Sequence, residues 1–112
     1  MIDAHQHFWR LARGDYGWLT ADFGPIYRDF GPEDLAPLLA AARVRQTVLV
    51  QATPTVAETR YLLQLAARTP FVAAVVGWAD LTAPEAVETI DMLRADPLLR
   101  GLRPMLQSID DT

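Results

Sequence analysis

The sequence has no cysteine among its 112 residues, so it can form neither a disulfide framework nor a thiolate metal site. It also has no lysine: its ten basic residues are all arginines, scattered along the chain, and the formal net charge is -4. Nucleic-acid-binding proteins usually carry a basic patch, so this pattern argues against a nucleic-acid partner. Asp3, His5 and His7 stand where a signal peptide would need a basic start and an apolar run, and no run of about 18 apolar residues is present, so we expect neither a signal peptide nor a membrane partner. We therefore expect a cytoplasmic protein.

Composition is that of an ordinary globular protein, with 51% hydrophobic and 21% charged residues. At 112 residues the chain has the length of about one average domain, well short of the large enzyme scaffolds. We therefore expect residues 1–112 to form one folded unit.

Apolar runs and helical periods alternate along the chain. The strand-like runs are 2–8, 47–52, 71–80 and 99–106. The segments with helical spacing are 32–44, 57–69 and 83–96. Pro32 stands at an expected first helical position, and Pro70 would end the second helix. Residues 9–31 are rich in glycine, aspartate and aromatic residues without a clean period, which predicts a long loop, with room for a helical turn.

Strands that alternate with helices predict the α/β class with a parallel sheet. Two architectures fit: an open doubly wound sheet, or part of an eight-stranded β/α barrel. No Gly-x-Gly-x-x-Gly follows the first strand, which argues against the dinucleotide-binding version of the open sheet. A complete barrel takes roughly 250 residues, so four strands correspond to the N-terminal half of a (β/α)8 TIM barrel. Residues 1–112 are then a partial barrel domain, either a fragment or a half-barrel.

His5 and His7 are the only histidines of the chain and stand two residues apart on the first predicted strand. Residues i and i+2 of a strand point to the same face, so we expect the two imidazoles to lie side by side. At the carboxyl end of a barrel strand they would lie where such enzymes hold their chemistry, and neutral imidazole is the commonest metal ligand. A catalytic zinc ion needs a third protein ligand from elsewhere in the fold. The alternative is a hydrogen-bonded, inert pair at a strand end.

Further candidates lie in the first loop and at the ends of the later strands. Trp9, Tyr16 and Trp18 would hang over the mouth of a barrel, where aromatic faces suit a sugar ring, or would only pin the loop by packing. Arg103 could hold a carboxylate or a lactone oxygen, and Trp78 is a second candidate for substrate binding. For three further residues we favour a structural role over a functional one: Gln51, Asp80 and Gln107.

The ordered series IDAHQHFW, DYGWL, FGPEDLAPLLAAARV, TVLVQA, ETRYLLQLA, VVGWADL and GLRPMLQ resembles the N-terminal part of the amidohydrolase superfamily. It is most similar to the amidohydrolase-2 branch of sugar-lactone hydrolases, such as the L-fuconolactonases and L-rhamnonolactonases. The resemblance implies a β/α barrel of about twice this length that opens a sugar lactone by water attack on the carbonyl. It also implies that His5 and His7 bind a divalent metal such as zinc, or act on the carbonyl without a metal.

Two departures from the family pattern limit how far the activity of the family can be expected of this chain. Some lactonases have a histidine where this chain has Pro104, and the later histidine and the final aspartate that activates water would lie beyond Thr112. We therefore expect little or no turnover from a monomer of this chain. Two alternatives stay open: a self-associating half-barrel, hence a homo-oligomer, and a decarboxylase of the same superfamily.

Overall fold

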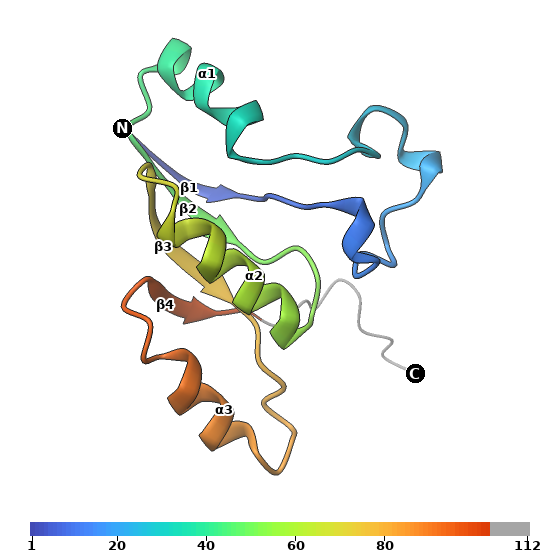
Figure 1. Cartoon of the computed structure of the whole chain (residues 1–112), viewed down its shortest axis with the longest axis vertical. Helices are drawn as coiled ribbons and strands as arrows, with labels where there is room; N and C mark the ends of the chain where they lie inside the picture. Colours follow the sequence, from blue (N-terminus) through green and yellow to red (C-terminus); the bar gives the residue numbers. More distant parts are fainter. Residues whose placement is uncertain (104–112) are drawn as a thin grey trace.

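Strands and helices alternate along the chain (Figure 1). The structure, a computed structural model, describes residues 1–103. The strands are β1 (Ile2–Gln6), β2 (Gln46–Val50), β3 (Val72–Gly77) and β4 (Leu99–Leu102). The α-helices are α1 (Pro32–Ala42), α2 (Val56–Ala67) and α3 (Ala86–Leu93). All seven predicted elements are therefore present, with shorter bounds at most of their ends.

All neighbouring strands of the sheet are parallel and follow one another in the order β1-β2-β3-β4. A helix connects each strand to the next, as in repeated βαβ units. This confirms the predicted α/β class and is the arrangement of one half of a (β/α)8 barrel.

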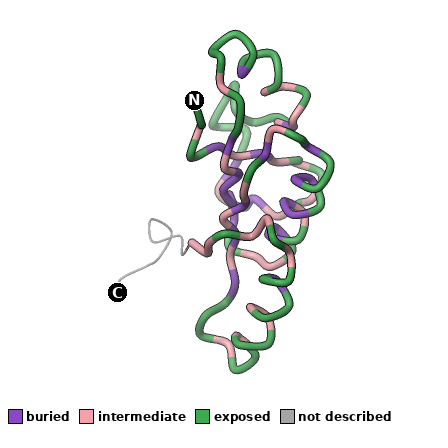
Figure 2. Tube along the Cα trace, turned by 90° about the vertical axis from the view of Figure 1, so that its left-hand side faces the viewer, coloured by how far each residue is buried: buried purple, intermediate pink, exposed green. Residues whose placement is uncertain are grey.

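The core lies between the sheet and its helices. Leu49 of β2, Leu62 of α2 and Val75 of β3 are fully buried there, together with Phe8 after β1. All three helices contribute side chains that pack against this core, and in Figure 2 the buried residues concentrate in the middle of the molecule. On the other face of β2, Val48 is half-buried and Val50 is buried, so this face is covered near the carboxyl end of the strand and less so before it.

Local signals explain where the helices begin. Pro32 is the first residue of α1, as predicted, and the Asp34 carboxylate accepts a hydrogen bond from the Gly31 backbone N–H at 2.9 Å. That bond lowers the pKa of Asp34. The α2 helix begins after Thr55, whose hydroxyl oxygen accepts a bond from the Glu58 N–H at 3.0 Å.

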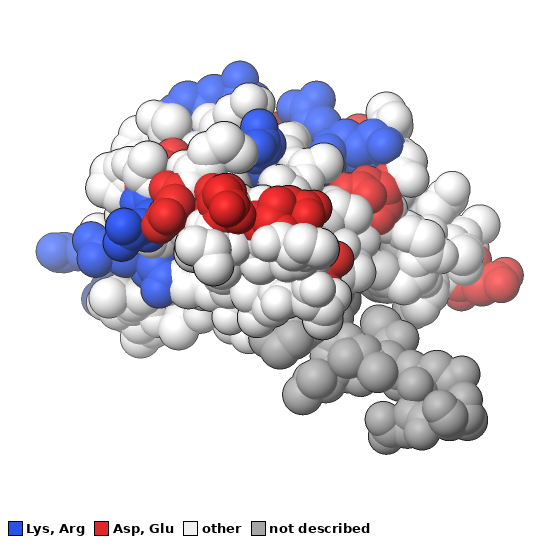
Figure 3. Space-filling view, turned by 90° about the horizontal axis from the view of Figure 1, so that it is seen from below, with Lys and Arg blue, Asp and Glu red and all other residues white. Residues whose placement is uncertain are grey.

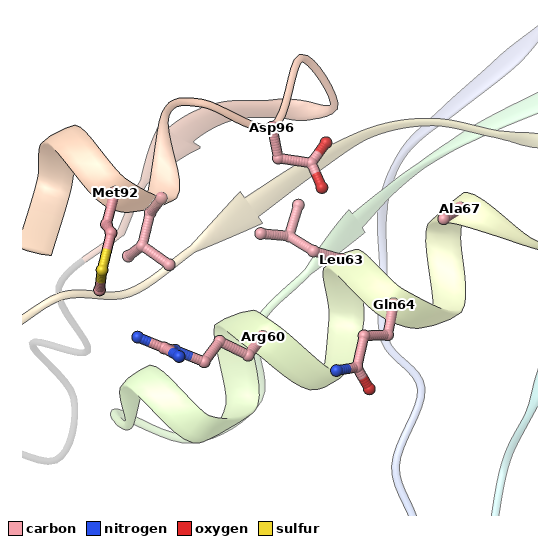
Figure 4. Close-up of a pocket in the computed structure, with 7 residues that line it drawn as sticks. Arg60, Leu63, Gln64, Ala67, Met92 and Asp96 are labelled. Carbon is pink, nitrogen blue, oxygen red and sulfur yellow. The ribbon is translucent and has the colours of Figure 1, made fainter.

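Acidic side chains gather in a band on the surface seen from below, at the α3 end of the molecule (Figure 3). The segment at α3 contributes to this acidity with three exposed acidic residues at a spacing of three, namely Glu85, Glu88 and Asp91. A shallow groove between α2 and α3 is lined by Leu63, Met92 and Asp96 among others (Figure 4). It lies on the helical side of the sheet.

Residues 9–31 form the predicted long loop, which contains two short 3-10 helices, η1 (Leu11–Arg13) and η2 (Ala21–Ile26). Trp9 and Phe30 join the two ends of the loop through a pair of antiparallel backbone hydrogen bonds of 3.0 and 2.9 Å. Among residues 1–103, no helix is long and apolar enough to cross a membrane.

The buried leucine of β2 provides a test of this core. Leu49→Ala leaves a cavity between the sheet and the helices, and we expect it to lower the free energy of unfolding by about 2–5 kcal/mol. The matched control is Leu38→Ala on α1, where the side chain is 64% exposed and the expected change is within about 0.5 kcal/mol. Urea unfolding followed by circular dichroism measures both; equal losses would contradict the described core.

Candidate active site

The two histidine rings converge at the carboxyl end of β1. His5 lies in the strand, and His7 lies just past Gln6, where the strand ends two residues earlier than predicted. Their Nε2 atoms are 3.2 Å apart, and the ring centroids are separated by 5.0 Å at an interplanar angle of 77°. The intervening Gln6 points to the opposite, helical side, where its amide nitrogen donates to the Thr47 hydroxyl at 3.2 Å. The predicted side-by-side pair is therefore present on the face away from the helices.

Pairing with β2 fixes the protonation of His7. Its Nδ1 lies 2.8 Å from the Val50 carbonyl oxygen, which can only accept a hydrogen bond, so Nδ1 carries the proton. Burial lowers the pKa of His7, the Val50 bond opposes this, and the nearby His5 and Arg103 lower it further. The ring is therefore neutral at pH 7 and presents an unprotonated Nε2 toward His5.

This arrangement fits part of a metal site. Two nitrogen ligands about 2.0–2.1 Å from one tetrahedral ion lie roughly 3.4 Å apart, close to the observed 3.2 Å between the Nε2 atoms. A ligating histidine also commonly donates its other N–H to a carbonyl, as His7 does to Val50. Within residues 1–103, however, no three histidine, aspartate or glutamate side chains are grouped to hold an ion. The pair could thus supply two ligands of such a site.

Arg103 reaches from the end of β4 to the end of β2. Its Nε donates to the Gln51 side-chain oxygen at 2.7 Å, and its Nη2 donates to the Gln51 backbone oxygen at 2.8 Å. Gln51 itself is fully buried. The Arg103 charge also reaches His7, whose pKa it helps to lower. The structure thus gives Gln51 a polar contact that local sequence patterns do not indicate.

Trp78 and Asp80 follow β3, which ends at Gly77, although the sequence predicted a strand as far as Asp80. The backbone of Trp78 exchanges two hydrogen bonds of 2.7 Å with the buried Thr59 hydroxyl. Trp78, Asp80 and Arg103 line a cavity of about 150 Å³. The Asp80 carboxylate accepts bonds from the hydroxyl and the N–H of Thr82, which lower the pKa of Asp80. This agrees with a role for Asp80 in leading the chain into the next loop.

Aromatic rings of the first loop pack beside His7. Trp9 stacks on His7 with a centroid distance of 6.5 Å, and the Trp18 ring meets Trp9 edge-on at 5.5 Å. Both indole N–H groups donate to backbone carbonyls, Trp9 to Arg28 and Trp18 to Ala52. The packing role is thus present in the structure, and contact of these rings with a sugar stays a prediction.

A buried ionic network, which the sequence did not reveal, holds this loop in place. Glu58 of α2 is fully buried; one carboxylate oxygen accepts from Arg13 at 2.6 Å and from the Tyr16 hydroxyl at 2.7 Å. Its other oxygen accepts from the Ala52 N–H at 2.8 Å. Burial and then the Glu58 charge raise the pKa of Tyr16, so its hydroxyl stays protonated and donates. The candidate Gln107 lies outside the described residues, as does Pro104, the position at which some lactonases have a histidine.

Comparison with known proteins agrees with the family resemblance seen in the sequence. The family described as Amidohydrolase matches residues 2–110. An L-fucono-1,5-lactonase of Burkholderia ambifaria is 56% identical over 110 residues, which cover 98% of this chain and 38% of the relative. An L-fucono-1,5-lactonase of Burkholderia multivorans is 44% identical, with 98% and 37% covered. The chain therefore spans well under half the length of these relatives.

Solved structures agree with the sequence matches. Two crystal structures of an amidohydrolase from Burkholderia multivorans, one with bound HEPES and one with bound zinc, are 44% identical to this chain. Their TM-scores are 0.89 and 0.88, and the match covers 98% of this chain and 38% of each of theirs.

The Glu58 network can be tested by removing its acceptor. We expect Glu58→Ala to lower the free energy of unfolding by about 3 kcal/mol or more, because Arg13 and the Ala52 N–H lose a buried partner. Glu88→Ala, at an exposed position of α3, is the control and should change stability by at most about 0.5 kcal/mol. Urea unfolding followed by tryptophan fluorescence measures both variants. A loss of similar size in both would contradict the role given to Glu58.

Proposed function

The chain belongs to the amidohydrolase family, and from this premise we propose that it supplies the first half of the barrel and the histidine pair of a sugar-lactone hydrolase. The observation that carries the proposal is the 3.2 Å approach of the His5 and His7 Nε2 atoms at the carboxyl end of β1. Active sites of β/α barrels lie at this end. The substrate class is supported by the two Burkholderia relatives, both L-fucono-1,5-lactonases.

In the proposed reaction, water attacks the ring carbonyl of the lactone, and the ring opens to a hydroxy acid. One of the Burkholderia multivorans structures contains bound zinc, and in this chain a divalent metal would be held by His5 and His7 and would polarise that carbonyl. The Val50 carbonyl keeps the His7 Nε2 unprotonated for this purpose. Without a metal, the two imidazoles would act on the carbonyl directly. The family resemblance places the base that accepts the proton from water on a later strand.

The decisive experiment supplies the later strands from a relative. In a chimera, this chain replaces the matched 110 residues of the Burkholderia ambifaria lactonase. We expect the chimera to open L-fucono-1,5-lactone, measured by acid release. His5→Ala and His7→Ala should each lower kcat/KM by about 10² or more, the loss typical when one polarising group is removed.

Gln46→Ala, at an exposed position at the amino end of β2, is the control and should leave kcat/KM unchanged. A folded chimera that opens no lactone, or that keeps its rate without the histidines, would refute the proposal. Release of carbon dioxide from carboxylic acids in place of lactone opening would favour the decarboxylase alternative. Chelation followed by zinc addition separates the metal-dependent from the metal-independent version.

Self-association is the second candidate, and the sheet supports it. β1 and β4 are the two edges of the described sheet, and unpaired strand edges readily pair with another chain. A homodimer could bring two half-barrels together about a two-fold axis. We therefore expect sedimentation equilibrium of this 112-residue chain to report a dimer in the micromolar range. A monodisperse monomer at these concentrations would exclude this candidate.

A further inference from the structure

Gln51 occupies an unusual position for a polar side chain. It is fully buried directly after β2, and its amide nitrogen has no hydrogen-bond partner among the described residues. An unpaired buried amide costs free energy, which an apolar side chain of similar size would not incur. The one polar contact made by the side chain among these residues is that of its oxygen with Arg103. The contact with Arg103 is therefore the interaction that accounts for a glutamine at this buried position.

The contact holds one edge of the guanidinium. An arginine has five N–H groups, and Gln51 accepts from two of them, one on Nε and one on Nη2. These two N–H groups lie on one side of the planar group. The second N–H of Nη2 and both N–H groups of Nη1 make no hydrogen bond to the described residues, so a complete second edge is left for a planar anion.

The surroundings offer space for such a ligand. Arg103 and Trp78 line the cavity of about 150 Å³ at the ends of β3 and β4. Arg103 is also close enough to His7 for its charge to lower the pKa of that ring. No carboxylate forms a salt bridge with Arg103 within residues 1–103, so its charge is not neutralised there.

We infer that Gln51 is a positioning residue: it holds one edge of Arg103 so that the other edge binds the carbonyl oxygen of the lactone and the carboxylate of the opened hydroxy acid. This inference rests on the proposed function for the identity of the ligand. The contact between Gln51 and Arg103 is independent of it and can be measured separately.

The first experiment uses the 112-residue chain. In a ¹H–¹⁵N spectrum, we expect the Nε–H signal of Arg103, identified by its loss in Arg103→Leu, to be shifted and protected from exchange. Gln51→Leu removes the acceptor and should return this signal to the range of exposed arginines. Gln64→Leu, at an exposed position of α2, is the matched control and should leave it in place. An unchanged signal in a folded Gln51→Leu chain would overturn the inference; Gln51→Met replaces that variant if circular dichroism shows it unfolded.

The second experiment measures binding without turnover. Calorimetry of the chimera with the hydroxy acid formed from L-fucono-1,5-lactone should show Kd rising about tenfold in Gln51→Leu, the loss of one charge-assisted hydrogen bond. In an Arg103→Leu background, Gln51→Leu should cause no further change, because it acts through the arginine. The inference would be overturned if Gln51→Leu raised Kd equally with and without Arg103, or if the unmodified chimera did not bind the hydroxy acid. Failure of the proposed function would give a different result, namely a chimera that does not open the lactone.

Discussion

Parallel pairing of the strands in chain order is the constraint on which the site depends. Because all four strands run in the same direction, the residues that follow them meet at one edge of the sheet. Backbone hydrogen bonds hold two of these residues in register, from Gln51 to Val76 at 2.8 Å and from Arg103 to Gly77 at 2.9 Å. His7 is fixed in the same way through its ring nitrogen and Val50. The chemistry of this edge is therefore a consequence of strand register.

The loop between β1 and α1 adds a second constraint on the histidines. Glu58 binds Arg13 and Tyr16 of this loop and also the backbone of Ala52, so one buried carboxylate joins the loop to the β2–α2 connection. The same loop packs Trp9 against the His7 ring. His7 is thus held by a carbonyl on one side and by an indole on the other, which limits the orientations of its ring. An oriented ring is what both ligation and carbonyl polarisation require.

Local signals in the sequence were sufficient for the elements and for the histidine pair. Apolar runs, helical spacing and Pro32 predicted all seven elements, and a separation of two residues predicted that His5 and His7 share a face. The ends were less accurate: the apolar residues Trp78 and Ala79 continue the pattern of β3 after its pairing has ended. Contacts between residues far apart in the sequence could not be predicted from local patterns. Glu58 looks like an ordinary acidic residue in the first turn of a helix, and its partner Arg13 is 45 residues away.

Arg13 and Arg103 differ in the groups that they contact, and this difference distinguishes a structural arginine from a functional one. Arg13 contacts the carboxylates of Glu58 and Asp15, at 2.6 and 3.3 Å. Burial opposes its charge, but the hydrogen bond to Glu58, together with the interactions with Tyr16 and the Glu58 charge, outweighs this and raises the pKa of Arg13. The charge of Arg13 is therefore paired within the fold. Arg103 is instead held by two neutral oxygen atoms of Gln51, which orient the guanidinium and leave its charge uncompensated among the described residues. A fixed, unneutralised cation beside a neutral imidazole is suited to an oxygen atom that gains negative charge, because the site need not reorganise when the charge develops.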